Sequence, residues 1–152
     1  MDKKDLQIIY ELQRDGRLSN HELAERVNLS PSPCLRRVRN LEKSGVIQGY
    51  TALIDQKAFG LPITIFVRIR LERHSTETAR TFEQAISKTD EVLDCHLMTG
   101  DSDYLLRVIV ESLEAYEVFV REKIHRIPNI ASIETSFAYG VIKQSRAFVK
   151  NG

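Results

Sequence analysis

The spacing of apolar residues changes once along this chain, and that change constrains the fold more than any other feature. Through residue 45, apolar side chains recur at the intervals of one face of an α-helix. From Pro62 onward, apolar side chains alternate with a second, mostly polar set over residues 63–71, as in a half-buried strand. The sequence therefore predicts an α+β protein with a helical N-terminal domain and a sheet-containing C-terminal domain.

Three short helices are predicted before residue 45. Ser19 and Glu22 have the spacing of a capping box and start the second helix after a break at Gly16. The third helix is expected between Ser30, a capping residue, and Gly45, which stops it. Its buried stripe is expected at Leu35, Val38 and Leu41.

The segment VIQGYTALI, residues 46–54, has strand-like composition around a glycine and predicts a small hairpin, or wing. Three helices and a hairpin make a winged helix-turn-helix, which we assign to residues 1–54. Residues 55–61 have no apolar period and are expected to be a linker.

Residues 62–152 are expected to form a ferredoxin-like βαββαβ domain, with both helices on one face of an antiparallel sheet. After the strand at 63–71, the expected elements are a helix at 75–87, strands at 91–100 and 103–111, a helix at 113–127 and a strand at 130–140. The other sheet face needs a cover, and a second subunit of a homodimer is the simplest one. Its expected apolar residues are Phe66, Met98, Leu105 and Ile109.

The third helix concentrates positive charge in a chain whose formal net charge is only +1. A helix fits the major groove of DNA, where guanidinium groups can bond guanine edges and other cations hold phosphates. We expect Arg37 and Asn40 to face the bases, Arg36 and Ser32 to flank them, and Lys43 to meet phosphates. The predicted contacts to a double-stranded DNA operator are Ser30, Ser32, Pro33, Arg36, Arg37, Arg39, Asn40 and Lys43.

Other classes of protein are disfavoured. No run approaches the ~18 apolar residues of a membrane span, and the chain starts with MDKKD, so a cytoplasmic protein is expected. Cys34 and Cys95 have no partners at metal-ligand spacing, which predicts neither a metal site nor a disulfide. The carboxylates between residues 90 and 103 come without a nucleophile–base pair, so we expect no enzyme and no cofactor.

Two long stretches resemble the Lrp/AsnC (feast/famine) family of transcription regulators. They are DGRLSNHELAERVNLSPSPCLRRVRNLEKSGVIQGYTALI and, after the linker, CHLMTGDSDYLLRV with KQS. The resemblance runs from about Lys4 to Ser145. It implies a helix-turn-helix at about residues 20–39 and a RAM/ACT-like C-terminal domain that dimerises, often towards octamers, and binds an amino acid such as leucine or methionine.

The resemblance also implies an effector pocket between subunits, formed by a turn of one and the fourth strand of the other. A glycine-containing turn offers backbone donors to a carboxylate, and Asp101, Asp103 or Thr135 could hold an ammonium group. The alternatives are that both aspartates are only polar turn residues, or that the protein wraps DNA with little effector dependence. The implied pocket residues are Leu97, Thr99, Gly100, Asp101, Asp103, Tyr104, Thr135, Ser136 and Phe137.

Overall fold

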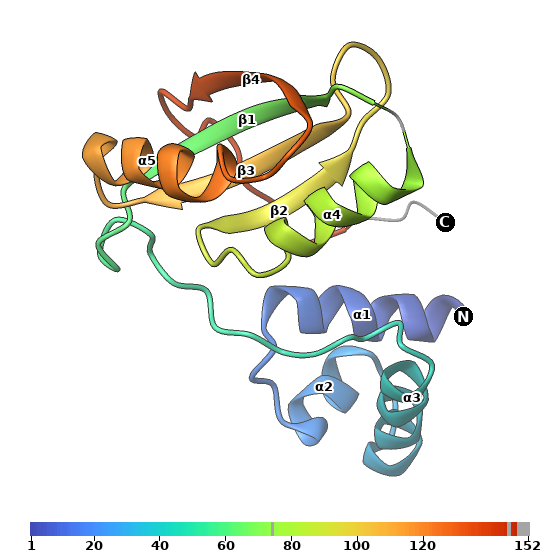
Figure 1. Ribbon diagram of the computed structural model, residues 1–152. Helices are drawn as coiled ribbons and strands as arrows, with labels where there is room; N and C mark the ends of the chain where they lie inside the picture. Colours follow the sequence, from blue (N-terminus) through green and yellow to red (C-terminus); the bar gives the residue numbers. More distant parts are fainter. Residues whose placement is uncertain (74, 146, 149–152) are drawn as a thin grey trace. The chain divides into compact units, whose positions relative to one another are not determined.

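The computed structural model describes residues 1–73, 75–145 and 147–148 (Figure 1). Contacts divide the chain into two compact units, one of residues 1–53 with the chain from Ile142 onward and one of Ile54–Val141. The last four residues of the predicted C-terminal domain lie outside the described part. Within the described part, no helix is long and apolar enough to cross a membrane.

The N-terminal unit contains the three predicted helices, which are α1 (Lys3–Arg14), α2 (Asn20–Arg26) and α3 (Pro31–Lys43). The predicted capping box is confirmed, because Ser19 accepts from the Glu22 N–H and Glu22 accepts from the Ser19 N–H. The turn between α2 and α3 places Asn28 at a φ of 52°, a conformation that asparagine tolerates. The core shared by the three helices consists of Ile8, Leu23, Ala24, Val27, Cys34 and Leu41.

Two details of α3 differ from the prediction. Cys34 is fully buried while Leu35 is 36% exposed, so the buried stripe is Cys34, Val38 and Leu41, and its centre lies about 30° around the helix from the predicted one. Ser30 is the N-cap, but its side chain makes no cap bond. Pro33 occupies the third helical position and has no N–H to donate, which removes one of the two usual partners of a cap.

The predicted hairpin is absent, because residues 46–54 contain no strand. The Ile47 N–H instead donates to the Leu41 carbonyl, and Ile47 packs on the helical core. The Tyr50 hydroxyl donates to Glu42. The segment is therefore anchored to α3 at its start and has no strand partner within the described chain.

The C-terminal unit has the predicted ferredoxin-like order. One antiparallel sheet has the strand order β2-β3-β1-β4, and α4 and α5 lie on one of its faces (Figure 1). The core between sheet and helices includes Val67, Leu106, Phe82 and Phe119. The elements are β1 (Ile63–Leu71), α4 (Thr76–Ile86), β2 (Val92–Leu97), β3 (Tyr104–Val110), α5 (Leu113–Phe119), the π-helix η1 (Val120–Ile124) and β4 (Ile130–Phe137).

The single helix predicted over residues 113–127 is interrupted. Its second half is η1, where the His125 N–H donates to the carbonyl of Val120, five residues earlier. Residues 55–61, the predicted linker, form hydrogen-bonded turns, and the Gln56 side chain bonds Thr64 of β1.

Candidate DNA and effector sites

The surface of α3 that faces away from the helical core carries most of the predicted DNA contacts. Ser30, Ser32 and Asn40 are exposed there. Arg36, Arg39 and Lys43 are exposed as well, and within the described residues none of these three cations has an ion-pair partner. Unpaired cations on an exposed helix can neutralise DNA phosphates without first breaking an internal pair.

Arg37 lies differently from its neighbours. It is half-buried, and its Nη1 donates to Asp2 Oδ2 at 2.8 Å and to Asp5 Oδ1 at 2.7 Å. The buried stripe of Cys34, Val38 and Leu41 explains this position, since it places Arg37 at the edge of the core beside α1 and Arg36 on the opposite side of the helix. Because Arg36 is exposed and Arg37 is not, we expect Arg36 to face the base edges in place of Arg37.

The predicted effector turn lies between β2 and β3. Thr99, Gly100 and Asp101 are exposed, and Leu97 is 76% exposed at its start. Gly100 has a φ of +106°, which a residue with a Cβ rarely adopts. The turn thus presents apolar, backbone and carboxylate groups to solvent together.

Asp103 and Tyr104, predicted in the same pocket, face inward. Asp103 Oδ2 accepts from the Leu71 N–H at 2.7 Å, beside the register shift between Arg70 and Leu71. The buried Tyr104 hydroxyl lies 2.9 Å from Glu83 Oε1, and burial first, then this carboxylate, raises the pKa of Tyr104 to about 12. Asp103 thus bonds the turn to β1, and Tyr104 bonds β3 to α4.

The β4 residues of the predicted pocket divide between the two sheet faces. Ser136 is paired with Phe66 on the face opposite the helices, which we call the open face. Thr135 and Phe137 are on the helix face, where both contact Tyr116: its hydroxyl lies 2.6 Å from Thr135 Oγ1, and its ring meets that of Phe137 edge-on. The sequence does not mark Tyr116 as a neighbour of these residues, because its position fits an ordinary core stripe.

Within one chain the turn and the end of β4 do not meet. Tyr104 pairs with Ile69 of β1, whereas Phe137 pairs with Ile65 on the other side of that strand. Four strand residues span about 13 Å, and β1 itself lies between the two groups. One subunit therefore cannot form a pocket from both groups.

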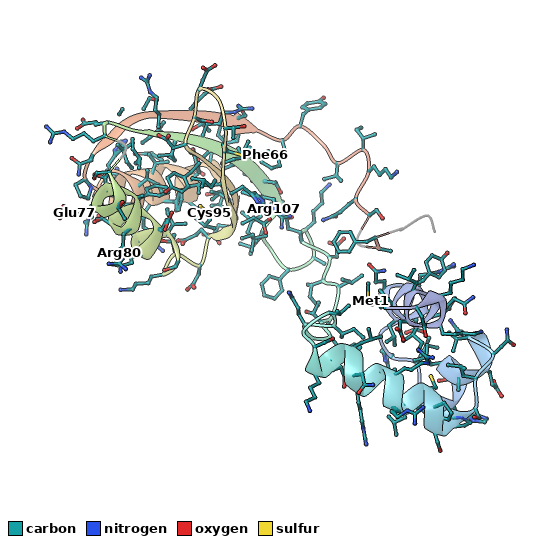
Figure 2. The ribbon with its side chains drawn as sticks, turned by 90° about the vertical axis from the view of Figure 1, so that its right-hand side faces the viewer. Met1, Phe66, Glu77, Arg80, Cys95 and Arg107 are labelled. Carbon is teal, nitrogen blue, oxygen red and sulfur yellow. The ribbon has the colours of Figure 1, made fainter. Side chains whose placement is uncertain are left out.

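The open face has an apolar centre flanked by ion pairs. Phe66 is 37% exposed and pairs in register with Arg107, and Figure 2 shows both on the sheet, away from Glu77 and Arg80 of α4. Leu105 and Ile109 are half-buried on the same face. The flanking ion pairs are Arg107–Asp94 and Arg68–Glu134.

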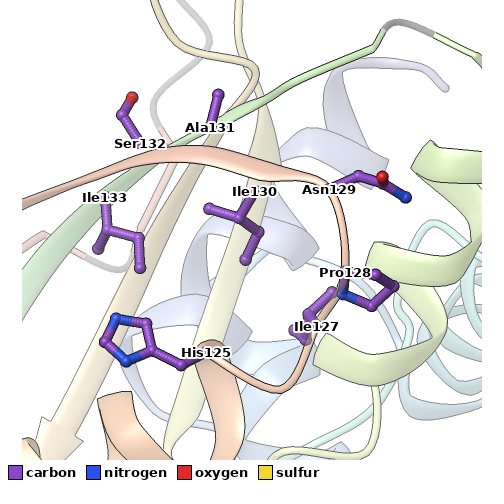
Figure 3. Close-up of a pocket in the computed structure, with 8 residues that line it drawn as sticks. All are labelled: His125, Ile127, Pro128, Asn129, Ile130, Ala131, Ser132 and Ile133. Atoms are coloured by element: carbon purple, nitrogen blue, oxygen red, sulfur yellow. The ribbon is translucent and has the colours of Figure 1, made fainter.

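A separate pocket lies where η1 leads into β4 (Figure 3). Ile130 and Ile133 point toward His125, while Ala131 and Ser132 point to the other side of β4. None of the predicted effector residues lines it. Among the residues that the structure describes, no cluster of His, Cys, Asp or Glu could hold a metal ion.

A helix-turn-helix with an exposed cationic helix, joined to a ferredoxin-like domain with a solvent-facing turn, defines a DNA-binding regulator with a ligand-binding domain. Family models match both parts, as a winged helix-turn-helix DNA-binding domain over residues 1–48 and an Lrp/AsnC ligand binding domain over residues 64–148. The chain belongs to the Lrp/AsnC family of transcriptional regulators.

Similar proteins share nearly the whole chain. The leucine-responsive regulatory protein of Escherichia coli is 42% identical over 98% of this chain and 91% of its own. A transcriptional regulator of Neisseria meningitidis, solved in complex with L-Met, has a TM-score of 0.93 at 36% identity, covering 98% of this chain and 96% of its own. An AsnC family regulator of Agrobacterium tumefaciens has the same TM-score at 38% identity, covering 98% of this chain and 97% of its own.

Proposed function

We propose that this protein binds an operator as a dimer or larger assembly, up to an octamer, and that a free amino acid such as leucine or methionine shifts its assembly and DNA binding. Two relatives support this choice of effector, since one is a leucine-responsive regulatory protein and the other was solved in complex with L-Met. Free amino acids and operator DNA meet in the cytoplasm, which is the location we propose.

The proposal rests mainly on the separation, across β1, of the two sets of predicted effector-binding residues, those of the turn and those at the end of β4. Because the turn and the end of β4 lie apart in one chain, a ligand that touches both must bridge two subunits. A ligand shifts an assembly equilibrium only by binding one state better, and a bridging site supplies such a difference. The apolar open face, including Phe66, offers a surface on which a second copy can pack.

In this site the turn backbone at Thr99 and Gly100 holds the ligand carboxylate, and Asp101 pairs with its ammonium group. Asp103 is less suited, since its carboxylate already accepts the Leu71 N–H. On DNA, Arg36 and Asn40 face base edges. Ser30, Ser32, Arg39 and Lys43 contact phosphates.

A thermal-shift screen against the twenty amino acids tests the effector. A ligand that binds only the folded protein raises its melting temperature by mass action. The same amino acid should then change operator affinity. A screen in which no amino acid shifts the melting temperature or the affinity would contradict the proposal.

A further inference from the structure

The first turn of α1 is bonded to both other helices of the DNA-binding unit. Asp2 and Asp5 bond Arg37 of α3, as described above. Lys4 Nζ donates to the carbonyl of Val27, at the end of α2, at 2.6 Å. Three residues of one turn therefore connect the helices that place the recognition surface.

The charges of this cluster are mutually stabilised. Asp2 is the N-cap of α1 and forms a capping box with Asp5, where the helix dipole favours negative charge. Bonds to the Asp5 backbone first, and to Arg37 next, lower the pKa of Asp2. Bonds to Asp5 and Asp2 raise the pKa of Arg37. Asp2 and Arg37 therefore both remain charged at neutral pH.

The position of Arg37 on α3 determines which side chains of this helix face solvent. Successive helical residues are about 100° apart, so an Arg37 held on the α1 side places Arg36 towards solvent. A rotation of α3 by one residue would move Arg37 to the position that Arg36 now occupies and move Arg36 to that of Leu35. Productive recognition needs side chains held within about 10–20° of their working geometry.

We propose that Asp2 and Asp5 are positioning residues for DNA recognition, which hold α3 through Arg37 in the rotation that presents Arg36 and Asn40 to the operator. The proposal rests on the DNA-binding function of the family. Arg37 contributes alignment, and it contributes no phosphate or base contact.

The test compares Arg37→Gln, Asp5→Asn and their double variant in the full-length protein. The probes are a duplex enriched by the wild-type protein from a random pool, and the unselected pool itself. Each single variant should lower affinity for the enriched duplex about tenfold, and the double variant should lose little more, because the two residues act as one unit. Affinity for the random pool and the salt slope should stay unchanged.

Two matched controls make the result specific. Arg39→Gln makes the same chemical change on an exposed, unpaired arginine of α3, and it should flatten the salt slope by about one ion on both probes. Glu25→Gln removes one negative charge from exposed α2 surface and should change neither measurement. Arg37→Lys should restore part of the specificity, and thermal unfolding checks that each variant is folded.

The alternative is that Arg37 contacts DNA directly. In that case Arg37→Gln would flatten the salt slope as Arg39→Gln does, and Asp5→Asn would strengthen binding by releasing the guanidinium. Either result overturns the proposal, as do additive losses in the double variant. A wild-type protein that enriches no duplex would instead contradict sequence-specific DNA binding itself, so the two failures are distinguishable.

Discussion

The carboxylate of Asp103 accepts the backbone N–H of Leu71, with 2.7 Å between Asp103 Oδ2 and Leu71 N. This bond lies where β1 shifts register against β4, and the Asp103 N–H donates to the Ile69 carbonyl beside it. Asp103 thus satisfies a backbone donor that the irregular strand end leaves without a ladder partner.

Replacing Asp103 with alanine should lower the free energy of unfolding by about 1–3 kcal/mol, because a partly buried N–H loses its acceptor. Asp103→Asn should cost less, since the amide oxygen can still accept. Chemical unfolding measures both, with Asp101→Ala as the exposed control. An Asp103→Ala protein as stable as the Asp101→Ala protein would contradict the bond's role.

Asp101→Ala should blunt the amino-acid response while operator binding without effector stays near wild type. The reason is its exposed carboxylate on the turn, which is free to pair with an ammonium group. Coupling between effector and DNA of about 1–3 kcal/mol should largely vanish. Operator affinity with and without saturating amino acid measures this coupling, and an unchanged difference would remove Asp101 from the site.

Tyr104 should make stability depend on pH in the alkaline range. Its pKa is raised from 10.0 to about 12, so the folded state favours the neutral phenol. This contribution to stability is complete below the unfolded value of 10.0 and is lost as pH rises through about 12. Unfolding free energies of wild type and Tyr104→Phe should converge over that range. Parallel curves would contradict the assignment.

Arg36→Ala and Lys43→Ala should weaken DNA binding in different ways. Arg36→Ala should cost about 1–3 kcal/mol on the operator and relax discrimination, because it removes a base contact. Lys43→Ala should weaken all sequences alike and reduce the salt slope by about one ion. Titrations of operator and random DNA at several salt concentrations separate these effects. Equal losses on both DNAs for Arg36→Ala would refute the base contact.

Phe66→Glu should shift the protein towards monomers. The substitution puts a charge in the apolar centre of the open face, where we expect a second copy to pack. Leu113→Glu, on an exposed apolar residue of α5, is the control and should leave assembly unchanged. Sedimentation velocity reports the distribution of species. Assembly that survives Phe66→Glu would place the subunit interface elsewhere.

Much of the fold followed from residue spacing. Alternation over residues 63–71 and helical spacing before residue 45 predicted both domains, because burial on one face imposes these periods. One residue of the buried stripe of α3 was predicted wrongly, since Cys34 and Leu35 are adjacent and both can serve as core residues. Only the tertiary contacts of α3 with α1 and α2 decide between them.

The candidate sites were less predictable for a related reason. The sequence marks Arg37 as a cation but does not show that Asp2 and Asp5, more than thirty positions away, occupy it. The inward roles of Asp103 and Tyr104 likewise depend on partners in β1 and α4. Strand-like composition at residues 46–54 suggested a hairpin, although a strand forms only where a partner is available.

Two separate segments of the chain contribute to the N-terminal unit, one before the ferredoxin-like unit and one after it. Gln13 of α1 bonds the backbone of Phe148 through both its amide oxygen and its amide nitrogen, and the ferredoxin-like unit lies between these residues in sequence. During synthesis the helical unit emerges first, but Phe148, the partner of Gln13, is synthesised only after the second unit has been completed. The domain made first on the ribosome is thus the last to acquire its full set of contacts.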